Sequence, residues 1–151
     1  MNNANEKIIE TLNHLAGLAE DGKNGYEKAA QNTDDVNLKD LFLRLSHERT
    51  TYLQELQGLL QNLGSTTWSY HGIPASIHRR WIDIKAAVLP ASINAMIYSC
   101  ATGDSVALKV YQYALNKEHI TGNIRSTISG QHSGIRASLD MLRNYGSVAI
   151  V

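Results

Sequence analysis

Polar and ionisable side chains interrupt the apolar stripe of each long helical segment in this sequence, and their chemistry could serve a function. Carboxylate and imidazole groups bind iron and manganese in proteins, so a cluster of them could form a metal site. An arginine in the same cluster would instead pair with a carboxylate and neutralise it. The candidate residues are Glu20, Glu48, Arg49, Asp104 and His132.

The spacing of the histidines does not follow the pattern of a two-metal site. Bundles that hold two iron or manganese ions supply one Glu from each of two helices and a Glu-x-x-His pair from each of the other two. Here the residue three positions before His47 is Arg44, and the residue three positions before His132 is Ser129. Arg49 also adds positive charge where two metal ions would need an excess of carboxylates. The sequence therefore assigns no residue to a catalytic or metal-binding role.

Three interpretations of these residues stay open. An ionised carboxylate buried alone is costly, so Asp104 requires a cation or strong hydrogen-bond donors. The favoured interpretation is a buried polar network in which Arg49 pairs with Asp104 and His132 is hydrogen-bonded beside them. The alternatives are a reduced, mononuclear or weak site for iron or manganese, and a site for a small ligand.

Long amphipathic helices must position these polar residues. Apolar residues recur at steps of three, four or seven, which is helical spacing, and no segment alternates with a period of two. The polar interruptions lie near the midpoints of the long helices, and the midpoints of antiparallel helices share one layer of a bundle. We expect helices over residues 5–31, 36–63, 74–88 and 91–116, and from the cap Thr121 to about residue 145.

Residues with capping chemistry mark the ends of the second helix. Asp34 and Asp35 can each accept hydrogen bonds from exposed first-turn N–H groups, so either one can cap its start. Gly64 is the residue type that most often follows a helix C-terminus. These signals predict a short connection between the first and second helices.

Short connections join the first helix to the second and the third to the fourth, which predicts two antiparallel hairpins. The long stretch between the hairpins must cross the length of the bundle, so the second and third long helices should run parallel. The expected fold is all-α, a ferritin-like four-helix bundle whose long crossover contains a short fifth helix. We expect one domain over residues 1–146 and an apolar tail over residues 147–151.

Composition restricts the class of protein. The 151 residues include 14 Lys plus Arg, 14 Asp plus Glu and one Cys. A net charge of zero provides no basic surface for nucleic acid, and one cysteine cannot form an internal disulfide. The polar N-terminal segment predicts no secretory signal, and no apolar run approaches the ~20 residues that cross a membrane. We therefore expect a cytoplasmic protein with no nucleic-acid or membrane partner, and a homodimer as one candidate assembly.

Several segments of the sequence together match a family pattern. They are residues 25–30 (GYEKAA), 38–42 (LKDLF), 52–56 (YLQEL), 103–104 (GD), 109–111 (KVY), 131–132 (QH) and 135–136 (IR). The most specific segment is residues 78–87 (HRRWIDIKAA), to which we attach no chemistry. With these segments the chain resembles the ferritin-like four-helix-bundle group of bacterial proteins of unknown function, distantly similar to rubrerythrins, over roughly residues 6 to 145.

The resemblance implies the bundle fold and, by analogy, a metal-related or stress-related role. The chain departs from the family pattern on the third helix, where Asp104 and Gln112 stand at positions that commonly carry Glu. We therefore expect a non-enzymatic binding or stress-related protein with a degenerate metal centre. The alternative is an oxidase or peroxidase-like protein that uses iron or manganese in the mid-bundle layer.

Overall fold

The chain folds into long α-helices in a computed structural model that describes residues 3–65 and 93–146. No residue in these two ranges forms a β-strand. The helices are α1 (Asn3–Gln31), α2 (Val36–Asn62), α4 (Ile93–Leu115) and α5 (Gly122–Gly146). The all-α, four-helix prediction is thereby confirmed. The expected helix over residues 74–88, which contains the 78–85 signature, and the tail over residues 147–151 lie outside the described residues.

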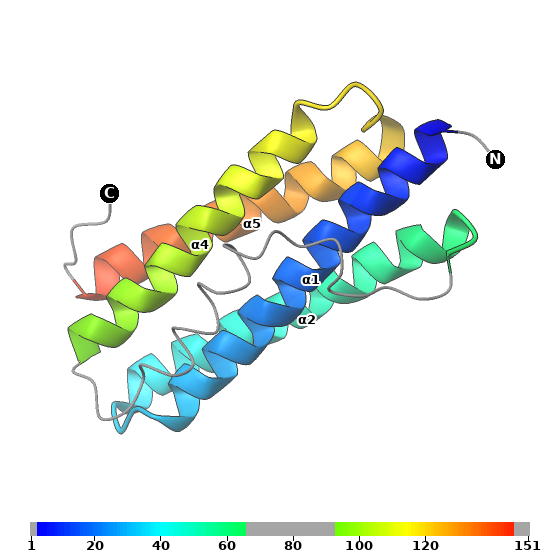
Figure 1. Cartoon of the computed structure of the whole chain (residues 1–151). Helices are drawn as coiled ribbons and strands as arrows, with labels where there is room; N and C mark the ends of the chain where they lie inside the picture. Colours follow the sequence, from blue (N-terminus) through cyan, green and yellow to red (C-terminus); the bar gives the residue numbers. More distant parts are fainter. Residues whose placement is uncertain (1–2, 66–92, 147–151) are drawn as a thin grey trace.

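The four helices form two antiparallel hairpins that lie side by side (Figure 1). α1 packs extensively on α2, and α4 packs on α5. The hairpins meet along α1 and α4 and, through the smallest contact, along α2 and α5. In Figure 1, α2 and α4 run in the same direction, as the long connection between them predicted.

The ends of α2 have the expected capping chemistry. The Asp35 side chain accepts a hydrogen bond of 2.8 Å from the backbone N–H of Leu38, so Asp35 is the N-cap. At the other end, Gly64 adopts a φ of 83°, which an L-residue rarely tolerates. Its N–H and that of Ser65 donate to the carbonyls of Gln61 and Leu60. This paired arrangement ends α2 one residue before the expected position.

The core runs along the inner faces of all four helices. The largest fully buried side chains among the described residues are Tyr26, Tyr111, Phe42, Leu12, Leu15, Leu38, Leu45, Leu56, Leu60, Ile97 and Ile120. Two of these side chains, Tyr26 and Tyr111, carry hydroxyl groups, so the core includes polar atoms that need hydrogen-bond partners.

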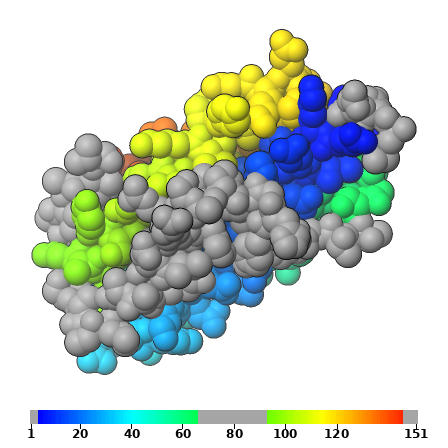
Figure 2. Space-filling view, in the orientation of Figure 1, coloured from blue at the N-terminus to red at the C-terminus, as the bar shows by residue number. Residues whose placement is uncertain are grey.

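The turn between α4 and α5 contacts the first half of α1. Figure 2 shows the yellow atoms of this turn against the blue atoms of α1. The Thr11 hydroxyl lies 3.4 Å from Nε2 of His119, which joins the two hairpins at this end. Within residues 3–65 and 93–146, no helix is long and apolar enough to cross a membrane.

Candidate functional site

A buried ion pair occupies the middle of the bundle. The Asp104 side chain on α4 is completely buried, and Arg49 on α2 is 2% exposed. Nη2 of Arg49 donates to both Asp104 carboxylate oxygens at 3.0 Å. The Tyr26 hydroxyl on α1 donates to Asp104 Oδ2. Three helices therefore converge on one carboxylate.

The Arg49 guanidinium has further partners. Its Nη1 donates to Glu48 Oε1 at 2.5 Å. Its Cζ lies 5.5 Å from the centroid of the Tyr26 ring and 5.6 Å from that of the Tyr52 ring. A cation at this distance from an aromatic face is attracted by the ring quadrupole. Carboxylates and aromatic rings together compensate the loss of water around this buried cation.

Glu48 extends the network to the fourth helix. Its Oε1 also accepts a hydrogen bond of 3.0 Å from the hydroxyl of Ser138 on α5. Ser138 is completely buried, and its hydroxyl lies 3.0 Å from the Gly134 carbonyl as well. Tyr26, Arg49, Asp104 and Ser138 thus connect α1, α2, α4 and α5 through polar contacts.

A second polar group lies beside the ion pair and is centred on Gln131 of α5. The Tyr111 hydroxyl donates to Gln131 Oε1 at 2.6 Å. Gln131 Nε2 donates to the Tyr52 carbonyl at 3.2 Å and to Glu55 Oε1 at 2.9 Å. Both polar atoms of the buried amide are therefore satisfied, by α4 on one side and by α2 on the other.

Burial and neighbouring charges shift the pKa values of the groups in this network, often in opposite directions. Burial raises the pKa of Asp104, while Arg49 and the Tyr26 hydrogen bond act to lower it. Burial is the largest influence on Arg49 and acts to lower its pKa, but the charges of Asp104, Tyr26 and Glu48 and the hydrogen bond to Asp104 together outweigh burial and raise the pKa. Burial also raises the pKa of Tyr26 well above its ordinary value and that of Tyr52 to about 12. Arg49 stays protonated, and both hydroxyls remain hydrogen-bond donors.

Two glycines make room for this network. A Cβ at Gly22 would lie 3.3 Å from Cγ of Arg49, so the missing side chain lets the arginine stem cross α1 closely. A Cβ at Gly134 would lie 1.7 Å from the Tyr52 hydroxyl, so any larger residue at this position would force the Tyr52 side chain to move. A cavity of about 10 Å³, the size of a single water molecule, borders Gly22, Arg49 and Asp104.

The structure confirms part of the predicted polar layer. Arg49 pairs with Asp104 as expected, and Glu48 contacts the arginine. The expected position of His132 beside them is wrong, because His132 is partly exposed while its neighbour Gln131 is buried. Glu20 is partly exposed, and no hydrogen bond or ion pair among the described residues joins it to Arg49 or Asp104. Across residues 3–65 and 93–146, no group of three or more His, Cys, Asp or Glu is arranged to hold a metal ion.

The sequence interpretation missed the tyrosines. Tyr26 and Tyr111 belong to apolar helical stripes, and their spacing alone gives no sign that their hydroxyls reach Asp104 and Gln131. Tyr52 contributes its ring to Arg49 and its carbonyl to Gln131. The signal available in the sequence was residue type, because a buried Tyr hydroxyl normally requires a partner.

Comparison with known proteins identifies a family without an assigned activity. A family model described as a domain of unknown function, DUF2383, matches residues 7–117, which is more than half of the chain. The match includes Tyr26, Arg49 and Asp104, while Gln131 and Ser138 lie beyond it. No curated protein matches the chain.

Proposed function

The chain belongs to the DUF2383 family, and we propose that it is a non-enzymatic binding protein with a ferritin-like bundle whose interior layer is structural. In this proposal the Arg49–Asp104 pair occupies the level at which ferritin-like bundles hold metal ions. The observation that carries the proposal is the geometry of Asp104, whose two oxygens already bind Arg49 and Tyr26. A metal ion at this carboxylate would have to displace the guanidinium.

The chemistry of the neighbouring groups supports the same proposal. A redox or hydrolytic metal site keeps an open coordination position for a substrate. Here the space beside Asp104 is about 10 Å³, which admits one water molecule and excludes an organic substrate. Recognition of a partner therefore uses the outer faces of the bundle.

The family resemblance supports the wider setting of the proposal. On that basis, we place the protein in the bacterial cytoplasm and in stress physiology, as a distant relative of the rubrerythrins. The small space beside Asp104 supports a protein that acts by binding and does not turn over a substrate in its interior.

Metal analysis tests the proposal. Protein purified without chelators is assayed for iron and manganese by mass spectrometry, and the purified protein is titrated with Fe²⁺ under argon and with Mn²⁺. We expect substoichiometric metal, and a melting temperature that excess metal does not raise, because a ligand that binds only the folded state would raise it.

One result would overturn the proposal. Stoichiometric iron or manganese that is lost in Asp104→Ala and retained in Glu10→Ala, an exposed carboxylate on α1, would establish an oxidase-type metal centre instead. His132→Ala serves as a further variant, because the metal alternative requires this histidine as a ligand.

A further inference from the structure

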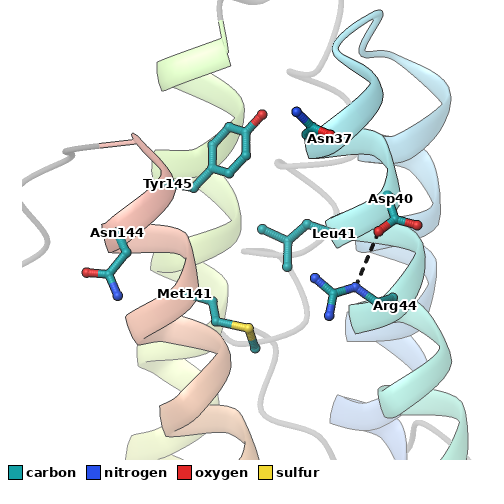
Figure 3. Close-up of a pocket in the computed structure, with 7 residues that line it drawn as sticks. All are labelled: Asn37, Asp40, Leu41, Arg44, Met141, Asn144 and Tyr145. Carbon is teal, nitrogen blue, oxygen red and sulfur yellow. Dashed lines mark ion pairs between the residues drawn. The ribbon is translucent and has the colours of Figure 1, made fainter.

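An open groove lies on the surface between α2 and α5. Its volume is about 450 Å³. Figure 3 shows side chains from both helices directed into it, with Leu41 opposite Met141 and Tyr145. The residues that line it are Asn37, Asp40, Leu41, Arg44, Met141, Asn144 and Tyr145.

Polar contacts hold α5 against α2 at both ends of the groove. At one end, the Tyr145 hydroxyl donates to Asp35 Oδ1 at 2.6 Å. At the other end, Ser138 donates to Glu48 Oε1 at 3.0 Å. The groove between these two contacts is therefore a preformed feature of the folded chain.

Apolar side chains are exposed in and beside the groove. Tyr145 is 39% exposed and Met141 is 36% exposed. Elsewhere on α2, outside the groove lining, Val36 is 80% exposed and Leu43 is 48% exposed. Aromatic residues and methionine are enriched in the interfaces of protein complexes, whereas lysine, aspartate and glutamate are depleted there.

Two opposite charges are among the residues that line the groove. Asp40 and Arg44 lie one helical turn apart, with Nε of Arg44 3.5 Å from Asp40 Oδ2. Their side chains are 72% and 64% exposed. A pair this exposed contributes little to stability within one chain. Both groups thus remain available for charges on a second molecule.

We propose that the α2–α5 groove is the interface of a homodimer in which Asp40 of each copy pairs with Arg44 of the other. A two-fold interface uses the same surface on both subunits, so that surface must be complementary to itself. One acid and one base, one turn apart on a single helix, meet this condition when two copies of α2 cross in antiparallel orientation. The net charge of zero removes long-range repulsion between the copies.

The proposed dimer accounts for the exposed apolar residues. A second copy seated on the groove covers Met141 and Tyr145, which line it. It also removes water from the two reciprocal ion pairs, which strengthens them relative to the exposed pair in a single chain. Arg49 and Asp104 do not line the groove, so the proposed dimer does not depend on the metal content of the interior.

Charge exchange across the two copies provides a sharp test. The variants are Asp40→Arg, which places two cations on the surface, and Arg44→Asp, which places two carboxylates there. Each variant alone would bring like charges together at both reciprocal contacts. We expect wild-type protein to sediment as a dimer and each variant to dissociate, with a dimer Kd raised by about tenfold or more.

Mixing the two variants distinguishes contacts between copies from effects within one chain. The copy with two cations and the copy with two carboxylates are complementary at both contacts, so an equimolar mixture should form a dimer. The double variant Asp40→Arg/Arg44→Asp, which exchanges the two charges within one chain, should also form a dimer. Matched controls are Glu27→Arg on α1 and Lys109→Asp on α4, which make the same charge changes at exposed positions on the two helices that do not line the groove. Both controls should remain dimeric.

Far-UV circular dichroism checks that the single variants fold, which we expect because both positions are exposed. A wild-type protein that sediments as a monomer at all concentrations would overturn the proposal and leave the groove to a different partner. Single variants that remain dimeric, or a mixture that remains monomeric, would also overturn it.

Discussion

Removing one member of the buried ion pair should destabilise the protein more than removing both. In Arg49→Met, the Asp104 carboxylate remains completely buried and keeps only the Tyr26 hydroxyl as a donor from the network. Leaving one partner of a buried pair uncompensated costs about 3–5 kcal/mol. The total free energy of unfolding of a domain is about 5–15 kcal/mol, so this single change removes a large share of it. Asp104→Leu should have a similar effect, because Arg49 then keeps only Glu48 as an anionic partner.

The double variant Arg49→Met/Asp104→Leu should recover most of the lost stability. Replacing a buried ion pair by apolar groups of similar volume is neutral or stabilising by about 1–4 kcal/mol. The Tyr26 hydroxyl then loses the Asp104 carboxylate as an acceptor, which costs about 1–3 kcal/mol. These terms nearly cancel, so the double variant should unfold close to the wild type. Adding Tyr26→Phe should remove the remaining cost.

Urea unfolding followed by far-UV circular dichroism measures each corner of this cycle. We expect a coupling free energy of several kcal/mol between Arg49 and Asp104, since residues in direct contact are not additive. The strongest form of the result is an Arg49→Met protein that fails to fold while the double variant folds. Single variants that each lose less than about 1 kcal/mol, with additive effects, would refute the reasoning that this pair is desolvated and coupled.

Three further predictions concern small residues and single titratable groups. Gly134→Ala should lower the free energy of unfolding by about 1–3 kcal/mol, because the new Cβ would collide with the Tyr52 hydroxyl. Gly130→Ala, one turn away and next to open space, should raise the free energy of unfolding by about 1 kcal/mol. Equal shifts of the urea midpoint in the two variants would contradict this prediction. Burial lowers the pKa of His14 from 6.5, so the unfolded chain binds a proton at this residue before the folded protein does as the pH falls. The free energy of unfolding should therefore fall between pH 7 and 5.5, and it should fall less in His14→Gln. Identical pH profiles of the urea midpoint for the two proteins would exclude a contribution from this residue. Cys100 is buried, and burial raises the pKa of its thiol. A disulfide reagent should therefore label the thiol only as fast as the protein unfolds. Fast labelling of the native protein would show that the thiol is accessible.

The helices and their ends could be predicted from the sequence because they depend on local chemistry. Apolar periodicity identified the four described helices, and Asp35 and Gly64 cap α2 as their residue types indicate. The pairing of Arg49 with Asp104 was also predictable, since two opposite charges in apolar stripes at mid-height have few other partners. These features follow from the cost of leaving a helix end or a buried charge unsatisfied.

The rest of the site depends on which of two adjacent residues on a helix faces the core. Apolar periodicity in the sequence does not decide this. Ile128 and Ile135 are seven residues apart, and either Gln131 or His132 can fill the turn between them. Adjacent residues differ by about 100° around the helix axis, so the side chain that faces the core is decided by packing. The structure buries Gln131, where its amide meets both Tyr111 and Glu55. A preference for histidine as the chemically active residue therefore pointed to the wrong neighbour.

Two arginine–aspartate pairs, one between α2 and α4 and one within α2, differ in their surroundings, and the proposals above give them different roles. Arg49 binds Asp104 in a buried site, where the charge interaction is strong and contributes to holding four helices around one layer. Arg44 binds Asp40 at 3.5 Å in a site open to solvent, where the same interaction is weak and salt screens it. In the proposed function the inner pair holds no ligand, because its donors and acceptors already bind each other. The outer pair becomes strong only if another molecule excludes water from it, and association at the groove should therefore weaken as salt concentration rises.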